Sequence, residues 1–274
     1  MKHERIFLRN RTAWLDTYFQ GSSLELKISA LRPCILICPG GGYQMTSDRE
    51  AEPIALAFAA RGFHTAVLRY PVFPTFYPEA LLSLAEALVW LRSHGPENHI
   101  HTEQITVCGF SAGGHLAASL GVFWQKPFLT QELGVDNAVF RPNRLLLSYP
   151  VITGGAYAHH NSIDHLLGKD ADEKARQAVS LEQHVNSFVP PTFIWHTYED
   201  QIVPVENTLL FVTALRKKGV PFELHLYSQG EHGLALANEV TATPDGGSVC
   251  HCCEGWVELA CNWLNRPIKA YVKR

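Results

Sequence analysis

The sequence contains no long uninterrupted hydrophobic segment. Its first residues, MKHERIFLRNRTAWLDTYF, mix charged and apolar side chains and therefore lack the apolar core of a secretory signal peptide. No later run approaches the roughly 20 apolar residues that a membrane-spanning helix needs. These absences predict a cytoplasmic chain that has no membrane partner.

A strong excess of charge of one sign is also missing. The formal net charge is -3, and the 23 lysine and arginine residues are spread along the chain instead of forming a cluster. Because nucleic acids are bound by clustered basic side chains, we expect no nucleic-acid partner. The expected partner is a neutral small molecule, and a homo-oligomer is compatible with the sequence.

The cysteines do not form the pattern of a disulfide framework, since their number, seven, is odd. The segment Cys250-His251-Cys252-Cys253 is the one that most resembles a metal site. Zinc ligand pairs are usually separated by two residues, whereas Cys252 and Cys253 are adjacent and no second pair follows. We therefore predict no metal site and no disulfide.

Glycine-rich nucleotide-binding motifs are incomplete in this chain. Gly40-Gly41-Gly42 follows an apolar run, but no Gly-Lys-Ser or Gly-Lys-Thr comes after it. Position 45 is Met, where a G-x-G-x-x-G motif would have glycine. The sequence therefore predicts neither a P-loop nor a dinucleotide site.

What the sequence does contain is a regular alternation of two patterns. Short apolar runs rich in β-branched residues predict buried strands at Cys34–Cys38, His64–Arg69, Ile105–Cys108, Leu145–Tyr149, Thr192–His196 and Phe222–Tyr227. Helical patterns lie between or after these runs, at Glu50–Ala60, Glu79–Ser93, Gly114–Trp124, Val205–Lys218 and Glu254–Asn265. The alternation predicts a single α/β domain over residues 1–274, with helices on both faces of a mainly parallel sheet. Leu24–Ser29 is predicted as an additional antiparallel strand.

The longest stretch without strand character is Val151–Pro191, between the fourth and fifth predicted strands. It is long enough to form a small cap or substrate-covering insertion, and we predict one there. Asp164, Asp170 and Asp172 belong to this stretch, in polar surroundings that favour solvated loop positions or helix caps over a catalytic role.

A nucleophile motif follows the third predicted strand. The segment Gly109-Phe110-Ser111-Ala112-Gly113-Gly114 stands between ITVC and the small-residue helix HLAASLGVF. A strand, a turn and a helix in this order are the context of a nucleophile elbow, whose strained turn leaves no room for side chains at Gly109 and Gly113. An ordinary Gly-rich loop is the alternative, but the context favours Ser111 as a catalytic nucleophile.

Backbone amides for an oxyanion hole are predicted after the first strand. In Pro39-Gly40-Gly41-Gly42-Tyr43, consecutive glycines let N–H groups approach a ligand without obstruction by side chains. We predict that Gly41, Gly42 and Ala112 supply the amides, with a turn that binds no ligand as the alternative. The polar residues just after this loop, at positions 47–50, are predicted to cap the following helix, with substrate binding as the alternative.

A serine nucleophile needs a base and an orienting carboxylate. His232 follows the last predicted strand, and its flanking glycines permit an unusual loop. Asp200 follows the fifth predicted strand, and we prefer it to Glu199 because the Val-Pro that follows suits a short turn into the next helix. The chain order Ser, Asp, His is the one expected of an α/β-hydrolase.

Three tyrosines lie near the predicted site in the sequence. Tyr43, Tyr70 and Tyr149 are predicted to contact the substrate, by shaping an acyl pocket or by stacking on a sugar. Packing in the core is the alternative role for each of them.

Four segments taken together resemble a known family. PGGGY, GFSAGGHLAASL, WHTYEDQIVPVENTLLF and YSQGEHGLALA are similar to α/β-hydrolase esterases, which include bacterial acetyl esterases and acetylxylan esterases. The resemblance implies the α/β-hydrolase fold and a catalytic triad of Ser111, Asp200 and His232. It also implies that the substrate is a small-molecule ester, such as an acetylated sugar or xylo-oligosaccharide. Pro39 stands where many related esterases have His, but the glycines that supply amides are intact.

The sequence thus predicts a serine carboxylesterase for short-chain acyl esters, above all acetyl esters, that works without a metal or organic cofactor. One alternative is a serine peptidase, which would use the same three residues on an amide, although the chain has no room for the large accessory domain of many α/β-fold oligopeptidases. The other is a non-catalytic binding protein of the same fold, which would not need Ser111, Asp200 and His232 intact.

Overall fold

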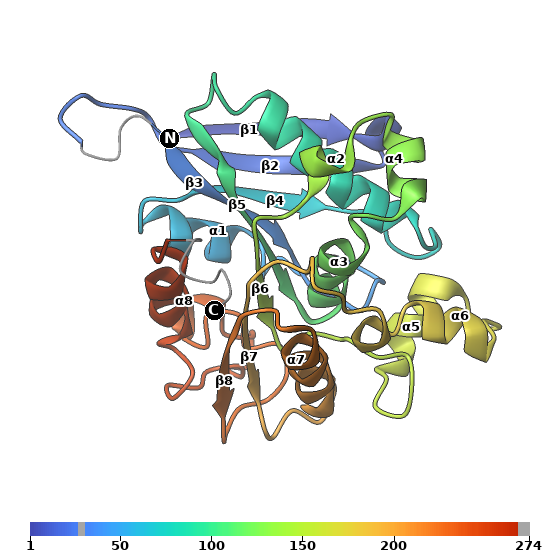
Figure 1. Ribbon diagram of the computed structural model, residues 1–274. Helices are drawn as coiled ribbons and strands as arrows, with labels where there is room; N and C mark the ends of the chain where they lie inside the picture. Colours follow the sequence, from blue (N-terminus) through green and yellow to red (C-terminus); the bar gives the residue numbers. More distant parts are fainter. Residues whose placement is uncertain (27–30, 268–274) are drawn as a thin grey trace.

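The computed structural model of the protein describes residues 1–26 and 31–267. In this part of the chain, eight strands form one sheet in the spatial order β1, β2, β4, β3, β5, β6, β7, β8 (Figure 1). Neighbouring strands from β4 to β8 are parallel, whereas β2 runs antiparallel to both β1 and β4. The strands are β1 (Lys2–Leu8), β2 (Ala13–Phe19), β3 (Arg32–Cys38), β4 (His64–Arg69), β5 (Ile100–Phe110), β6 (Arg144–Ser148), β7 (Thr192–Thr197) and β8 (Phe222–Tyr227).

The six apolar runs predicted as buried strands lie in β3 to β8, except that Tyr149 follows the end of β6. The additional strand predicted at Leu24–Ser29 is wrong for its first residues, because Leu24 and Glu25 lie in a turn, and residues 27–29 lie outside the described residues. The antiparallel strands are instead β1 and β2. Most side chains of β1 are exposed, so this edge strand lacks the apolar pattern by which a buried strand is predicted.

Helices cover both faces of the sheet, as predicted (Figure 1). One face is covered by α1 (Glu52–Ala59) and α8 (Trp256–Leu264), and the other by α2 (Glu79–Ser93), α3 (Ser111–Phe123) and α7 (Glu206–Lys218). These five helices correspond to the five predicted ones. The shorter elements are α4 (Pro127–Leu133), α5 (His160–Leu167), α6 (Glu173–Ala178), η1 (Arg9–Arg11), η2 (Asn137–Phe140), η3 (Leu181–Gln183) and η4 (Glu239–Thr241).

The central helix α3 is buried along its whole length. Its sequence, SAGGHLAASLGVF, is rich in glycine and alanine, which let its backbone lie close to β5 and β6. A Cβ atom at Gly121 would lie 2.5 Å from a methyl group of Leu145 in β6. The small residues are therefore a packing requirement, because protein interiors leave little space for an extra methyl group.

The register of the parallel strands brings their carboxyl ends to one edge of the sheet. Cys38 at the end of β3 pairs with Gly109 in β5, and Thr197 at the end of β7 pairs with Tyr227 at the end of β8. The loops that follow these strands therefore meet at one edge, where α/β proteins bind their ligands.

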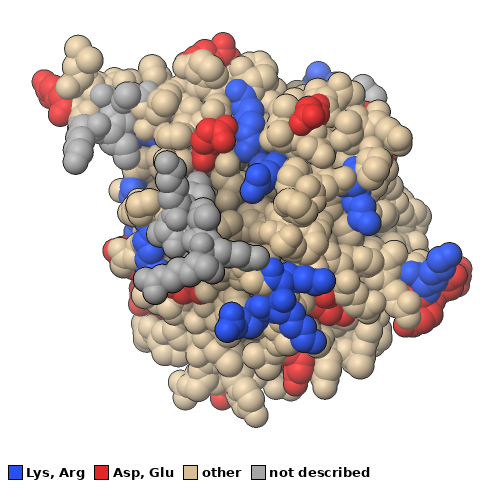
Figure 2. Space-filling view, viewed as in Figure 1, with Lys and Arg blue, Asp and Glu red and all other residues tan. Residues whose placement is uncertain are grey.

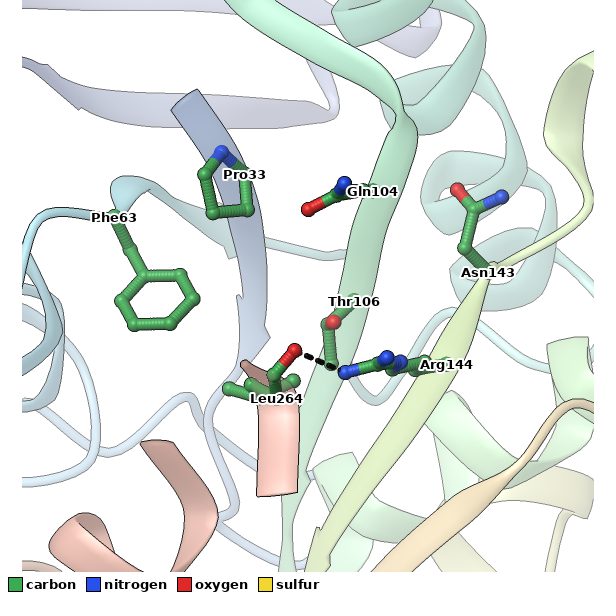
Figure 3. Close-up of a pocket in the computed structure, with 7 residues that line it drawn as sticks. All are labelled: Pro33, Phe63, Gln104, Thr106, Asn143, Arg144 and Leu264. Atoms are coloured by element: carbon green, nitrogen blue, oxygen red, sulfur yellow. Dashed lines mark hydrogen bonds between the residues drawn. The ribbon is translucent and has the colours of Figure 1, made fainter. Parts of the chain in front are cut away.

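At the opposite end of the sheet, Arg144, the first residue of β6, connects this strand to α8. Its guanidinium donates hydrogen bonds to the carbonyl oxygens of Trp263, Leu264 and Arg266 at the end of α8. Figure 3 shows the bond to Leu264 and the residues around it, which enclose a cavity of about 10 Å³. Several charge-assisted hydrogen bonds thus fasten α8 to the amino end of the central strands.

Charged side chains are distributed without a broad region of one sign on the face shown in Figure 2. Acidic and basic residues are scattered over it, and neutral residues cover most of the area. A polyanion would therefore meet both attractive and repulsive charges on this face. Within the described residues, no helix combines the length and the apolar character needed to cross a bilayer.

Candidate active site

Ser111 lies at the sharp turn between β5 and α3. Its φ angle is +51°, in the left-handed region that non-glycine residues adopt only under constraint. A Cβ atom at Gly109 would overlap the carbonyl oxygen of Gly113, and one at Gly113 would overlap the carbonyl oxygen of Cys38. The turn therefore has the backbone geometry and the need for glycine that the sequence predicted for a nucleophile elbow.

The structure brings Ser111, Asp200 and His232 together, although 121 residues separate the serine from the histidine. His232 Nε2 lies 2.8 Å from Ser111 Oγ, and His232 Nδ1 lies 2.6 Å from Asp200 Oδ2. Because Asp200 Oδ2 accepts the hydrogen on Nδ1, the lone pair of Nε2 faces the serine hydroxyl. This is the arrangement in which an imidazole can remove the serine proton.

The carboxylate of Asp200 is buried, and both of its oxygens are occupied. Oδ1 accepts hydrogen bonds from the backbone amides of Ile202 and Val203, each at 2.9 Å, and Oδ2 accepts from the rings of His196 and His232. Burial by itself raises the pKa of Asp200, but the hydrogen bonds from the two histidines and from Val203 outweigh it and hold the pKa well below its ordinary value. Asp200 is therefore ionised and fixed in orientation.

Sequence reasoning missed His196, the fifth residue of β7. Its Nε2 donates to Asp200 Oδ2 at 3.1 Å, and its Nδ1 lies 2.8 Å from Thr208 Oγ1. The position of a histidine near the end of a strand, four residues before the acid, was the available signal. The neighbouring carboxylate of Glu199 accepts a hydrogen bond from the Gly230 amide, whereas Asp200 is the carboxylate that contacts His232.

The predicted oxyanion loop lies beside Ser111. Gly41 and Gly42 have φ angles of +120° and +65°, which favour glycine, and both line the same pocket as Ser111. Ala112 is in the first turn of α3, where backbone amides have no acceptor within the helix. The preceding amide, Gly40, already donates to Glu50 Oε2 at 2.8 Å. The Gly40 amide therefore already has an acceptor, and Gly41, Gly42 and Ala112 remain the predicted donors.

Glu50 has a different role from the helix cap that the sequence predicted. Helix α1 begins after Ala51, and no side chain caps it. Glu50 is buried, and besides the Gly40 amide it accepts a hydrogen bond of 2.7 Å from the hydroxyl of Tyr149. That hydroxyl in turn accepts from the amide of Ala235, three residues after His232. Glu50 thus links the oxyanion loop to the histidine loop, a connection that only folding reveals.

The prediction that Tyr43, Tyr70 and Tyr149 contact the substrate is wrong in this structure, because all three are buried and absent from the pocket beside Ser111. Their hydroxyl groups are bonded internally. Tyr70 donates to the carbonyl oxygen of Pro39 at 2.6 Å, and Tyr43 lies 2.9 Å from Nδ1 of His115. A buried hydroxyl needs a hydrogen-bond partner, and these tyrosines find theirs within the protein. They therefore support the loops of the site without lining the pocket.

A pocket of about 420 Å³ opens in front of Ser111 and His232. Its walls carry more apolar than polar surface but include several polar side chains, and they come from the oxyanion loop, the segment before α1, α5 and the loops after β7 and β8: Gly41, Gly42, Gln44, Met45, Ser47, Arg49, Glu50, His159, Asn161, His165, Ile202 and Gly233. Amide, hydroxyl, imidazole and guanidinium groups offer hydrogen bonds to a polar ligand.

The segment predicted as a cap, 151–191, carries α5 and α6 and contributes to this pocket. His165 of α5 lies with Nδ1 2.9 Å from the carbonyl oxygen of Gly42, so α5 contacts the oxyanion loop directly. Of the acidic residues of the segment, Asp172 caps α6 as expected, whereas Asp164 lies within α5 and pairs with Arg176.

Comparison with known proteins places the chain among relatives that share this fold. Residues 24–215, more than two thirds of the chain, match the BD-FAE family. The chain belongs to the BD-FAE family. This assignment confirms the resemblance to the α/β-hydrolase esterases that the motifs indicated.

Individual relatives of this BD-FAE member agree with the assignment. A crystal structure of an acetyl ester-xyloside bifunctional hydrolase from Caldicellulosiruptor lactoaceticus has 37% identity and a TM-score of 0.77, over 92% of this chain and 86% of the other. The carboxylesterase Cest-2923 from Lactobacillus plantarum superposes with a TM-score of 0.83 and 29% identity over the full length of both chains. The α/β-hydrolase fold is thereby confirmed.

A curated relative is much longer than this chain. Endo-1,4-beta-xylanase B from Butyrivibrio fibrisolvens is 38% identical over 212 residues, which cover 76% of this chain and 33% of the relative. The chain spans between 33% and 54% of the length of the curated relatives that it matches.

Proposed function

We propose that this BD-FAE family member is a serine carboxylesterase that hydrolyses short-chain acyl esters, acetyl esters above all, and that sugars or xylo-oligosaccharides supply the alcohol. The observation that carries the proposal is the position of His232, within hydrogen-bond distance of both Ser111 and Asp200. Residues 1–274 act as one catalytic unit in this proposal, with segment 151–191 as part of its substrate-covering cap.

In the first step, Ser111 Oγ attacks the carbonyl carbon of the ester while His232 Nε2 takes the hydroxyl proton. The carbonyl oxygen becomes an oxyanion, which the amides of Gly41, Gly42 and Ala112 stabilise. The C–O bond to the alcohol then breaks, and the alcohol leaves with the proton that His232 held. Asp200 keeps the imidazole oriented and stabilises its charged form.

In the second step, water repeats the attack on the acyl-serine. His232 takes a proton from the water and returns it to Ser111 Oγ when the carboxylic acid leaves. Each proton that His232 accepts is given back within the same half-reaction, so the enzyme ends in its starting state. No metal or organic cofactor takes part in this scheme.

Polar side chains in the pocket support a hydrophilic alcohol group. Gln44, Arg49, Asn161 and His159 line the space in front of Ser111 and offer several donors to sugar hydroxyl groups. The acetyl ester-xyloside activity in the name of the Caldicellulosiruptor relative favours the same substrate class.

Hydrolysis rates on p-nitrophenyl esters of increasing acyl length, followed by acetylated xylo-oligosaccharides, test the substrate class. We expect kcat/KM to be highest for acetate and to fall steeply with longer acyl chains. If long acyl chains reacted best, the acetyl-sugar assignment would have to be dropped, although an esterase would remain.

Two further measurements address the rival functions. Short peptide amides assayed in parallel should react far more slowly than acetyl esters, and the opposite order would indicate a peptidase. A fluorophosphonate probe should label Ser111 in the wild type, whereas a folded protein that resists labelling would indicate a non-catalytic binding protein.

A further inference from the structure

Three cysteines lie together beside the loop that carries His232. The Sγ atoms of Cys250, Cys252 and Cys253 are all within 4.8 Å of one another. Cys253 is buried, Cys250 is half-buried and Cys252 is exposed, so the group has one side open to solvent. None of the three lines the pocket in front of Ser111, and the catalytic scheme above does not use them.

A backbone oxygen completes this group. The carbonyl oxygen of Gln229 lies 3.7 Å from Cys250 Sγ, 3.9 Å from Cys252 Sγ and 3.5 Å from Cys253 Sγ. Between sulfurs, Cys252 Sγ lies 3.3 Å from Cys250 Sγ and 3.7 Å from Cys253 Sγ. Three sulfurs and one oxygen therefore lie close enough together to surround a single ion.

Five of the six distances among these four atoms are close to those of a tetrahedral zinc coordination sphere. With Zn–S bonds of about 2.3 Å and a Zn–O bond of about 2.1 Å, tetrahedral geometry requires S···S distances of about 3.8 Å and S···O distances of about 3.6 Å. The S···O distances from Gln229, 3.5 to 3.9 Å, bracket the second value, and the S···S distances of 3.3 and 3.7 Å approach the first.

Two of the three thiols can donate to the two lone pairs of the Gln229 carbonyl oxygen, and the third can donate to a neighbouring sulfur, so neutral thiols are compatible with these contacts. The sulfurs are not disulfide-bonded, since their separations exceed the S–S bond length of about 2.05 Å. A cation at the centre satisfies all four groups at once.

The backbone holds the three cysteines in place without a metal. Residues 251–255 form successive turns, in which the amide of Cys253 donates to the carbonyl oxygen of Cys250 at 2.9 Å. The amide of Cys250 donates to the carbonyl oxygen of Ala237, also at 2.9 Å. In this tight turn, adjacent Cys252 and Cys253 both face the carbonyl oxygen of Gln229. The lack of a two-residue separation between them therefore does not prevent both from binding one ion.

We propose that Cys250, Cys252 and Cys253 bind one Zn²⁺ as thiolates, and that the carbonyl oxygen of Gln229 occupies the fourth position. Binding forms three Zn–S bonds and one Zn–O bond and releases the three thiol protons to solvent. The oxygen donor favours Zn²⁺ over Cu⁺, which prefers sulfur ligands alone. Because the protein fills all four coordination positions, the site is structural. The ion connects the turn at residues 250–253 to Gln229, three positions before His232.

Metal analysis of the full chain, purified under reducing conditions and without chelators, tests the proposal. We expect about one zinc per chain, or about one after titration with ZnCl₂ against a chromogenic chelator. Replacement by Co²⁺ should give thiolate-to-cobalt charge-transfer bands and the strong visible absorption of a tetrahedral centre. Saturating zinc should raise Tm by about 5 °C relative to chelator-treated protein, because the ion binds the folded state.

Substitutions separate this site from adventitious binding. Cys252→Ser alters an exposed side chain and should leave the fold intact, yet it should weaken zinc affinity by about 100-fold or more, since loss of a supporting contact alone costs about 10 to 100-fold. Two matched controls should bind zinc like the wild type: Cys261→Ala, a cysteine of α8 outside the cluster, and His251→Ala, whose imidazole is directed to Glu254.

Three results would overturn the proposal. One is a wild-type protein that binds no zinc with higher affinity than Cys252→Ser does. Another is loss of binding in His251→Ala, which would move the site to the histidine. The third is a reduced, folded protein that excludes zinc and closes a Cys250–Cys252 disulfide on oxidation. All three use the metal content and spectra as readout, so they are independent of whether the chain is an esterase.

Discussion

The two ends of the parallel strands are built from different kinds of residue. At the carboxyl ends, Ser111, Asp200 and His232 follow three separate strands, on loops that include backbone at positive φ angles. At the amino ends, Arg144 fastens α8 to the sheet through backbone carbonyl groups. The carboxyl end therefore exposes reactive groups to a pocket. At the amino end, by contrast, buried polar groups are hydrogen-bonded to one another within the protein.

The two ends of the strands therefore contribute differently to the stability of the fold and to the site. A strained backbone turn at Ser111 and an open pocket destabilise the folded state, and such features persist where a function requires them. The hydrogen bonds at the amino end serve stability, since a buried guanidinium or carbonyl without a partner destabilises the fold. Substitutions at the two ends should therefore change different measurements.

The largest expected effect is that of Ser111→Ala. Loss of the nucleophile should lower kcat by about a million-fold, as in other serine hydrolases, without changing Tm by more than a few degrees. Ser119→Ala, two turns further along α3 and buried but outside the pocket, is the matched control and should keep nearly full activity. A folded Ser111→Ala protein with undiminished ester hydrolysis would remove Ser111 from the mechanism.

Asp200→Asn should have the next largest effect. The amide cannot stabilise the imidazolium and favours the wrong tautomer of His232, so kcat should fall by about 10⁴-fold. Glu199→Gln changes the neighbouring carboxylate, which contacts Gly230 instead of His232, and should cost less than about 10-fold. Equal losses in the two variants would contradict the assignment of the acid.

Asp200 also makes stability depend on acid pH. Its pKa is lower in the folded protein than the ordinary 3.8, because hydrogen bonds from His196 and His232 outweigh the effect of burial. The unfolded chain therefore binds the proton more tightly, so the stabilising contribution is complete above pH 3.8 and is lost as the pH falls below it. Denaturant unfolding at pH 6 and pH 3 should show a smaller acid-induced loss for Asp200→Asn than for wild type.

Glu50→Ala should have an intermediate effect on catalysis. Glu50 holds the Gly40 amide and the Tyr149 hydroxyl, so its loss displaces the oxyanion loop, and kcat should fall by about 100-fold. Tyr149→Phe keeps the contact with Gly40 but removes the hydrogen bonds of the Tyr149 hydroxyl to Glu50 and Ala235, and it should lower kcat less. Together with the double variant it forms a thermodynamic cycle, and additive effects on kcat would show that the two loops are not coupled through this contact.

Arg144→Met should have the smallest effect on catalysis. Three carbonyl groups lose their donor, so the free energy of unfolding should fall by about 3 kcal/mol, whereas kcat/KM at a temperature well below Tm should stay within about two-fold of wild type. Urea unfolding and steady-state kinetics measure the two quantities. A large loss of kcat/KM in folded Arg144→Met would show that the ends are not independent.

The predicted and observed residues of the site differ in a consistent way. Ser111, Asp200 and His232 could be identified because each follows an apolar run, and the carboxyl ends of parallel strands meet at one edge. Glu50 was predicted to cap a helix, because its contacts with Gly40 and Tyr149 join segments whose approach no local pattern specifies. His196 was missed although it lies only four residues before Asp200. The tyrosines were placed in the pocket on their chemistry alone, whereas packing buries them and gives their hydroxyl groups internal partners.

The same contrast holds for the elements of the fold. Strands β3 to β8 are buried and mostly apolar, so their composition reveals them without further information. The edge strand β1 carries four charged or imidazole side chains in its first four residues, and only pairing with β2 makes it a strand. An edge position tolerates such a sequence because one side of the strand faces solvent.

By itself, the amino-acid sequence determined the α/β alternation, the nucleophile elbow and the order of the three site residues, because each depends on local periodicity or on residue types at fixed spacing. Only the tertiary structure decided which polar groups meet: Glu50 with Gly40 and Tyr149, and the three thiols of 250–253 with the carbonyl of Gln229. Distances between segments far apart in the chain follow from packing, and packing is a property of the whole core.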